Sequence, residues 1–181
     1  MMSHAVVAYP RFSDRDTAWI EAVRKSHDPQ FHLIRAHFTL VFPAPVLTAT
    51  LLPEVEKAVA GQPPFRIEVT RAVAHRDASA SRSHVFLVPA VGGKEIDALH
   101  QRLYEGALRP DRRPEIPYAP HITVAQKASH AECLELADTL NRRRISLSGL
   151  IEQIHVVTVA AVEVANVAAF DLGRLAFGGP V

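Results

Sequence analysis

The sequence predicts an α+β protein built from two related lobes around a central cleft. Residues 4–71 are expected to form strand, helix, strand, helix and strand, and residues 84–150 repeat this order. The motifs HFTL (37–40) and HITV (121–124) lie in corresponding strands of the two repeats, 84 residues apart. No low-complexity segment or long linker separates the repeats. Residues 1–181 are therefore expected to form a single domain of two repeated lobes, completed by C-terminal strands within residues 151–177.

The elements of the first repeat follow from hydrophobic spacing and from residues that begin or end helices. Trp19, Ile20 and Val23 recur at helical spacing, and the Asp28-Pro29 step ends that helix. Farther along, apolar residues alternate with polar ones, as in a half-buried strand. The expected elements are a strand at 4–9, a helix opened by Ser13 or Asp14, a strand at 35–42 that stops at Pro43, a helix at about 51–59 and a strand at 65–70.

The second repeat has the same succession of patterns. A polar, small-residue stretch at 75–83 indicates a loop before it, and a proline- and arginine-rich connection follows at 109–117. The expected elements are a strand at 84–91, a helix at about 94–107, a strand at 119–126, a helix opened by Ser129, and strands at 145–150, 154–162 and 168–177.

Composition excludes several classes of protein. The chain has 20 Lys and Arg residues against 19 Asp and Glu, so it lacks a large basic field. A single cysteine, Cys133, excludes an intramolecular disulfide and CxxC chemistry, and its apolar helical surroundings indicate a buried packing residue. The sequence has no recognisable signal peptide and no apolar run long enough to cross a membrane. We therefore expect a cytoplasmic protein that does not associate with membranes.

The two repeated motifs place polar side chains on otherwise apolar strands. Because strand side chains alternate between faces, His37 and Thr39 should share one face, and His121 and Thr123 should do the same. Such polar pairs need partners or must face a cleft. Two such strands side by side would bring two imidazoles and two hydroxyls together.

These motifs resemble the paired H-x-[ST]-x signature of the 2H phosphoesterase superfamily. Within it, the chain looks most like the bacterial 2′-5′ RNA ligase group, also called RNA 2′,3′-cyclic phosphodiesterases. The phrase YAPHITVA at residues 118–125 supports this resemblance, which covers most of the chain. The resemblance implies two pseudo-symmetric lobes, each with a mostly antiparallel sheet and outer helices, that line a concave active site.

The resemblance also implies an activity. Members of this group hydrolyse cyclic phosphodiesters of nucleotides or RNA ends without a metal or other cofactor, and the reverse reaction would be 2′-5′ RNA ligation. By position, His37 and His121 would be the catalytic histidines, with Thr39 and Thr123 as their phosphate-binding partners. The expected partner is RNA or a small nucleotide with a cyclic phosphate, and the expected state is a monomer.

The chemistry of these residue types fits that activity. Opening a cyclic phosphate needs a base for the attacking water and an acid for the leaving ribose oxygen, and histidine can serve as either near neutral pH. Threonine hydroxyls can donate to the non-bridging oxygens of the phosphate. Because the two motifs are equivalent in sequence, they do not reveal which histidine is the acid, and so which product forms stays open.

Three further residues are candidates for substrate binding. Arg35, two residues before His37, and Lys127, six after His121, would lie on the same strand faces if the strands stay regular, and either could add positive charge. Tyr118 could stack on a base or ribose. Solvated surface for the two cations, and packing for the tyrosine, are the competing interpretations.

Three other roles for the two motif histidines or for the whole domain compete with catalysis. The histidines could be hydrogen-bonded core residues, or zinc ligands joined by His84 or His155, although no spacing typical of zinc ligands supports a metal site. A non-catalytic RNA- or nucleotide-binding module of the same fold is the third alternative. An aromatic content of 7% and a formal net charge of +1 make this alternative weaker, because such modules use aromatic platforms and basic faces.

Overall fold

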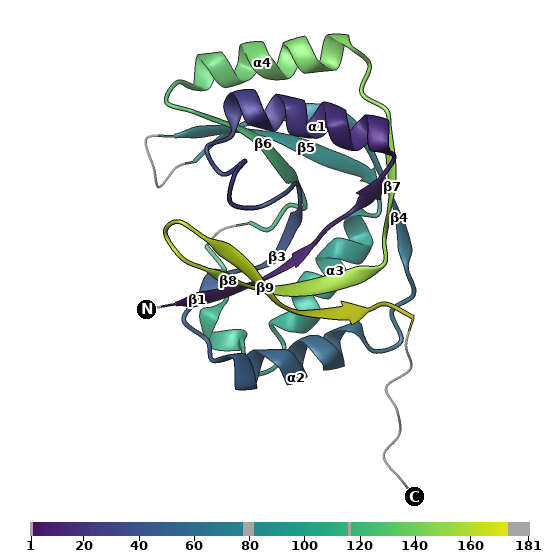
Figure 1. Ribbon diagram of the computed structural model, residues 1–181, viewed down its shortest axis with the longest axis vertical. Coiled ribbons are helices and arrows are strands. Elements are labelled where there is room, and N and C mark those ends of the chain that lie inside the picture. The colour runs from purple at the N-terminus through teal and green to yellow at the C-terminus, as the bar shows by residue number, and fades with distance from the viewer. Residues whose placement is uncertain (1, 78–81, 116, 174–181) are drawn as a thin grey trace, which may run out of the picture.

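Two antiparallel sheets lie between two pairs of helices in the computed structural model, which describes residues 2–77, 82–115 and 117–173 (Figure 1). The first sheet has the strand order β3 (Phe38–Ala44), β1 (Ser3–Ala8), β8 (Gln153–Val159) and β9 (Val164–Asp171). The second sheet has the order β2 (Arg11–Phe12), β7 (Leu147–Ile151), β4 (Phe65–Arg76), β5 (Ser83–Val91) and β6 (Ile122–Lys127). The predicted α+β class with antiparallel sheets is confirmed.

The helices cover the outer faces of the sheets. Helices α1 (Asp14–His27) and α4 (His130–Arg142) pack on the second sheet, and α2 (Thr48–Val59) and α3 (Gly93–Leu103) pack on the first (Figure 1). A single 3₁₀ turn, Arg109–Asp111, lies in the proline- and arginine-rich connection. Helix α1 begins as predicted, because the Ser13 hydroxyl accepts a hydrogen bond from the Asp16 amide at 3.1 Å.

The two sequence repeats exchange elements between the sheets. Read outward from the edge that carries each motif, β3-β1-β8-β9 corresponds to β6-β5-β4-β7. Strand β4 ends the first repeat but lies in the second sheet, and α1 packs on β6 of that sheet while α3 packs on β3 of the first. Neither repeat therefore builds a sheet by itself, and the pseudo-symmetry relates two interlocked halves.

Several element boundaries differ from the prediction. Strands β3 and β6 begin at Phe38 and Ile122, so both motif histidines come just before their strands. Pro43 does not end β3, because β3 is an edge strand on which a missing amide donor is tolerated. The long hairpin strands β4 and β5 take up both ends of the predicted 75–83 loop. Strand β9 ends at Asp171, and the predicted strand residues 174–177 lie outside the described residues.

The alternation predicted for the two motif strands is confirmed. Phe38 and Leu40 in β3, and Ile122 and Val124 in β6, are completely buried, whereas Thr39 and Thr123 between them are partly exposed. The apolar side of each motif strand therefore belongs to the core. Its polar side faces away from the core, as a binding face must.

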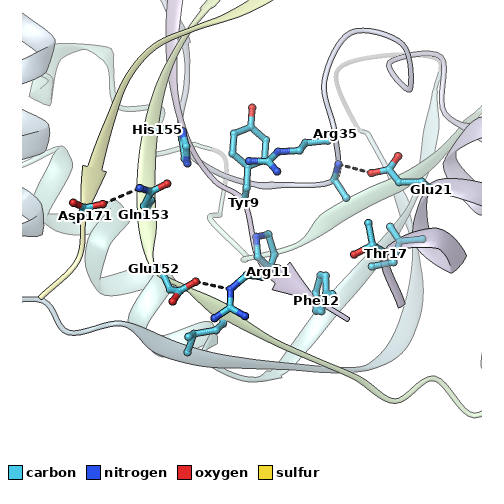
Figure 2. Close-up of a pocket in the computed structure, with 14 residues that line it drawn as sticks. Tyr9, Arg11, Phe12, Thr17, Glu21, Arg35, Glu152, Gln153, His155 and Asp171 are labelled. Carbon is cyan, nitrogen blue, oxygen red and sulfur yellow. Dashed lines mark hydrogen bonds and ion pairs between the residues drawn. The ribbon is translucent and has the colours of Figure 1, made fainter. Parts of the chain in front are cut away.

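A cavity of about 640 Å³ opens between the two sheets (Figure 2). Tyr9, the residue after β1, and His155 of the first sheet line its walls, and the second sheet contributes Phe12 and Leu150. Helix α1 lies at one side through Glu21 and Thr17.

In the part of the chain that the structure describes, no helix is both long and apolar enough to cross a membrane.

Candidate active site

The two motif histidines are held by the same local hydrogen bond. The Nδ1 atom of His37 lies 2.8 Å from the carbonyl oxygen of Arg35, and Nδ1 of His121 lies 2.6 Å from that of Ala119. A carbonyl oxygen only accepts hydrogen bonds, so each Nδ1 carries a proton. Each neutral ring then has its lone pair on Nε2, the atom available to take a proton from a ligand.

Each motif threonine is the second residue of the strand that follows its histidine. Thr39 pairs with Val7 of β1, and Thr123 pairs with Phe86 of β5. Neither hydroxyl makes a hydrogen bond within the described part of the chain. Both are therefore available to donate to an anion bound between the motifs.

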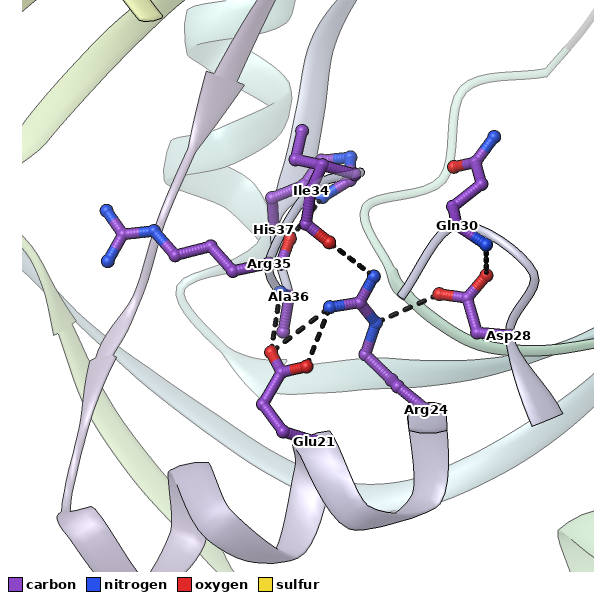
Figure 3. Close-up of polar contacts among 8 residues, drawn as sticks. All are labelled: Glu21, Arg24, Asp28, Gln30, Ile34, Arg35, Ala36 and His37. Carbon is purple, nitrogen blue, oxygen red and sulfur yellow. Dashed lines mark hydrogen bonds and ion pairs between the residues drawn. The ribbon is translucent and has the colours of Figure 1, made fainter. Parts of the chain in front are cut away.

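The segment that leads to His37 is fixed by a buried arginine (Figure 3). The side chain of Arg24 in α1 is only 1% exposed, and it donates to Asp28 at 2.9 Å and to the carbonyl oxygen of Ile34 at 2.6 Å. It also forms an ion pair with Glu21 at 2.9 Å. Each of the three guanidinium nitrogens thus binds a different partner, which the fork of donors suits.

The carboxylate partners of Arg24 extend this network to the backbone. Glu21 accepts a hydrogen bond from the amide of Ala36 at 2.9 Å, directly before His37, and Asp28 accepts one from the amide of Gln30 at 2.9 Å. We name these three charged residues, Glu21, Arg24 and Asp28, the Arg24 cluster. It holds residues 28–36, and therefore the Arg35 carbonyl that orients His37, against α1.

His121 has a different neighbour. The Phe86 ring stacks on its imidazole with 3.7 Å between ring centroids and 20° between planes. His75 and His84 stack on the same phenyl ring at 5.1 and 5.7 Å. The Phe86 ring therefore covers one face of His121 and also contacts two further histidines.

Both motif histidines favour the neutral form. Burial lowers the pKa of His121 to about 4, the hydrogen bond to Ala119 opposes this, and positive charge on His75, His37 or His84 lowers the pKa further. Burial also lowers the pKa of His37; the Arg35 carbonyl opposes this and the Arg24 charge adds to it.

Arg35 lies near the predicted site but not on the predicted strand. The chain bends at Ala36, before β3 begins, so strand alternation does not set the direction of the Arg35 side chain. Its guanidinium lies 4.0 Å from the centroid of the Tyr9 ring and lines the cavity (Figure 2). The Tyr9 ring in turn lies 6.2 Å from that of His37 in an edge contact.

The prediction that Lys127 shares the face of His121 is wrong. A β-bulge interrupts the pairing of β6 with β5, and both Val124 and Ala125 are completely buried. The extra residue reverses the alternation, so Lys127 lies on the helix-covered face. There its Nζ atom is 3.1 Å from Nδ1 of His27 in α1.

Tyr118 is a packing residue in this structure. Its hydroxyl donates to the carbonyl oxygen of Thr39 at 2.8 Å, and its ring stacks on His100 with 3.6 Å between centroids. His100 is buried and its Nδ1 lies 2.7 Å from the carbonyl oxygen of Leu40. The Tyr118 and His100 side chains therefore pack against β3 through the carbonyl oxygens of Thr39 and Leu40, and the Tyr118 ring is not free to stack on a base.

The third ligand considered for a zinc site is not brought to the motif histidines. His84 lies on β5 against Phe86, and His155 lies on β8 against Tyr9, with 4.9 Å between ring centroids. Among residues 2–77, 82–115 and 117–173, no three His, Cys, Asp or Glu side chains are grouped as metal ligands.

Three residues near the motif histidines were not predicted from the sequence: Tyr9, Arg24 and Phe86. A weak signal for Arg24 existed, because Glu21 and Asp28 stand three residues before and four after it in or next to one helix. Phe86 occupies a position that alternates with buried residues in a strand predicted to be apolar throughout. This alternation could have placed Phe86 on the side of its strand away from the core, but nothing in the sequence showed that this strand pairs with β6.

Comparison with known proteins identifies a family. A sequence model of the 2′-5′ RNA ligase superfamily matches residues 12–163. A Bacillus pumilus protein named "Putative phosphoesterase" is 30% identical over 156 residues, which cover 86% of this chain and 88% of that protein. A Bacillus licheniformis protein with the same description is 29% identical over 162 residues, covering 86% and 89% of the two chains.

Solved structures share the fold at low sequence identity. The structure of E. coli LigT complexed with 3′-AMP has a TM-score of 0.64 at 16% identity and covers 96% of this chain and 99% of that one. Kluyveromyces marxianus Usb1 has a TM-score of 0.54 at 9% identity, with coverage of 94% and 98%. With the family match over most of its length and two interlocked antiparallel sheets, the chain belongs to the 2′-5′ RNA ligase superfamily of 2H phosphoesterases.

Proposed function

We propose that this protein is a metal-independent phosphodiesterase that opens 2′,3′-cyclic phosphates of nucleotides or RNA ends. The observation that carries the proposal is the matched pair of imidazoles, each with Nδ1 held by a backbone carbonyl and Nε2 left for a ligand. Each is followed two residues later by a threonine on the partly exposed side of a strand. Two proton-transfer groups and two neutral donors are what in-line opening of a cyclic phosphate requires.

In the proposed reaction, His121 is the base and His37 the acid. Nε2 of His121 takes a proton from the attacking water, whose oxygen bonds to phosphorus. The bond from phosphorus to one ribose oxygen breaks, and that oxygen takes a proton from Nε2 of His37, leaving a phosphomonoester. The same steps, with a ribose hydroxyl of a second nucleotide in place of water, would open the cyclic phosphate to a phosphodiester and so correspond to ligation.

The environments of the two rings support this assignment. His121 lies against a phenyl ring, and its pKa of about 4 keeps it neutral, as a base must be. His37 also has a lowered pKa, but the negative charge of a bound phosphodiester favours its protonated form. The proposed assignment therefore rests on the stacked Phe86 ring, which covers a face of His121 and not of His37.

The comparisons support a nucleotide substrate. Structures of E. coli LigT with this fold are described as complexes with 3′-AMP, NADP+ and ATP. The curated relatives are named as phosphoesterases. Taken together, the two sets of names favour a nucleotide phosphoester as the substrate.

The test measures hydrolysis of 2′,3′-cyclic AMP by wild type, His37→Ala and His121→Ala, with the phosphate position of the product assigned by phosphorus NMR. Each substitution should lower kcat by roughly 10²- to 10⁴-fold, the usual range for one proton-transfer group. His32→Ala, which removes an exposed histidine outside the site, should retain full activity. EDTA should have no effect.

Two outcomes would contradict the proposal. Full activity in both motif variants would remove the catalytic assignment. If wild type bound RNA without hydrolysing any cyclic phosphate, the non-catalytic binding module of the same fold would be the better interpretation.

A further inference from the structure

A second pocket lies where helix α1 begins and helix α4 ends, on the helix-covered side of the second sheet (Figure 1). Its volume of about 340 Å³ lies within the usual range for small-molecule sites, roughly 300–1,000 Å³. Arg15 and Trp19, one turn apart on α1, line one side, and Arg143 and Arg144 line the other. This pocket and the cavity between the sheets share no described lining residue, so a ligand here would leave the candidate active site free.

The three arginines of this pocket have no protein partner for their charge. Elsewhere in the molecule, Arg11 and Arg24 each form an ion pair with a carboxylate. In the part of the chain that the structure describes, the guanidinium groups of Arg15, Arg143 and Arg144 form no ion pair and no hydrogen bond. Cations that gather in a pocket without partners create a local positive potential, which attracts an anion.

Two of these arginines occupy positions that the local backbone disfavours. Arg15 lies in the first turn of α1, where the helix dipole favours acidic side chains. Arg144 follows α4 with a φ of 51°, a left-handed conformation that glycine usually adopts after a helix. Both choices oppose stability locally, and departures of this kind are typical of residues that serve binding.

The lining suits a phosphate group attached to an aromatic base. Guanidinium groups bind phosphate oxygens through paired hydrogen bonds, and the Trp19 indole is an aromatic surface of the kind on which bases stack. Asp16 supplies the one carboxylate of the lining, which can accept hydrogen bonds from ribose hydroxyls or from a base amino group. Inorganic phosphate would use the arginines alone, whereas a nucleotide would also use Trp19 and Asp16.

We propose that this pocket is a second nucleotide site, in which Arg15, Arg143 and Arg144 bind the phosphate and Trp19 stacks on the base. The site does not depend on the proposed reaction, because it uses none of the residues of the candidate active site. A free nucleotide and a single nucleotide of an RNA strand offer the same chemistry, and the experiment separates these two sources.

Trp19 is the only tryptophan in the sequence, so the intrinsic tryptophan fluorescence of the protein reports on this pocket. Titration with 5′-AMP should change the fluorescence along a saturable curve, and inorganic phosphate should bind at least tenfold more weakly. Arg144→Gly should weaken 5′-AMP binding at least tenfold, as expected for lost hydrogen bonds to a charged group. This variant should stay folded, because glycine adopts the φ of 51° without strain.

Arg142→Ala is the matched control, and it should leave 5′-AMP binding unchanged. Arg142 belongs to the same run of arginines but does not line the pocket, and its guanidinium donates to the Thr139 hydroxyl at 3.4 Å. The titration repeated in His37→Ala should also be unchanged. Loss of hydrolysis in that variant and loss of the nucleotide site are therefore observed separately.

A four-nucleotide RNA, tetraadenylate, identifies the source of the nucleotide. If it binds at least tenfold more tightly than 5′-AMP and Arg144→Gly removes this binding, the pocket holds part of an RNA strand. Equal or weaker binding than 5′-AMP assigns the pocket to a free nucleotide. The proposal is refuted if neither ligand changes the Trp19 fluorescence, if inorganic phosphate binds as tightly as 5′-AMP, or if Arg144→Gly binds both nucleotide ligands like wild type.

Discussion

Replacing Arg24 with methionine removes the cation that holds the segment in front of His37. The side chains of Arg24 and Asp28 are 1% and 4% exposed, so Arg24→Met leaves a carboxylate buried without its partner. Breaking a buried ion pair in this way costs about 3–5 kcal/mol. For a chain of this length, that corresponds to a decrease in Tm of roughly 6–20 °C.

The same substitution should lower activity in molecules that remain folded. The Ile34 carbonyl loses its donor, and Glu21, which also binds the Ala36 amide, loses its counter-charge. The Arg35 carbonyl, which fixes the tautomer and direction of His37, lies between these two contacts. We expect kcat on 2′,3′-cyclic AMP to decrease more than KM changes, because a misdirected acid affects the chemical step more than binding.

Urea unfolding followed by circular dichroism, and kinetics well below the lowered Tm, would measure the two effects. Arg24→Lys keeps the charge but not the planar fork, so it should recover part of the stability and less of the activity. Lys25→Met, on an exposed position of the same helix, is the matched control. A midpoint for Arg24→Met equal to that of wild type would refute the energetic reasoning. Wild-type kcat in the folded variant would refute the positioning role.

Three further predictions concern protonation. First, kcat/KM should follow a bell-shaped pH profile with its maximum below pH 6.5, because the base must be neutral and the acid protonated while both pKa values are lowered. Second, Phe86→Leu exposes His121 to solvent and should move the acidic limb of that profile up from about pH 4 toward 6.5, whereas the control Phe170→Leu on β9 should not. Third, the free energy of unfolding should decrease as pH falls from about 6.5 to 4, because His121 takes up a proton in the unfolded chain and not in the folded one. This one group contributes at most about 3 kcal/mol, which is fully present above pH 6.5 and lost at low pH. Urea midpoints measured across this pH range would show the decrease.

The sequence predicted which elements form but not how the two repeats share them. Hydrophobic periodicity identifies the buried face of a strand, and it correctly separated Phe38 and Leu40 from Thr39. Periodicity carries no information about which strand lies alongside. The placement of β4 in the second sheet, and of α1 on that same sheet, therefore became visible only in the structure. The two-residue β2 is too short to leave any periodic signal.

The site residues outside the motifs were harder to predict, for different physical reasons. Lys127 was misplaced because strand alternation holds only until a bulge, and the bulge in β6 depends on its pairing with β5. Tyr118 had two open interpretations, and the choice depended on His100, a residue of α3 whose ring stacks on it. Arg24 looked like one of many surface arginines, because its burial results from the return of residues 28–36 over α1.

The equivalence of the two motifs left the proposed roles of the two histidines open, and the surroundings of the two rings differ. Both rings have the same hydrogen bond on Nδ1, so the hydrogen-bonded tautomer cannot distinguish them. The elements that the two halves exchange distinguish the two rings. Helix α1 places the Arg24 cluster beside the segment before His37, whereas β5 places Phe86 against His121. The proposed acid, His37, would gain its proton when the negatively charged substrate binds beside it. A ring against a phenyl group suits a base that must never be protonated first. Two histidines with equivalent motifs can therefore have the different roles proposed for them, because His37 lies beside the Arg24 cluster and His121 lies against Phe86.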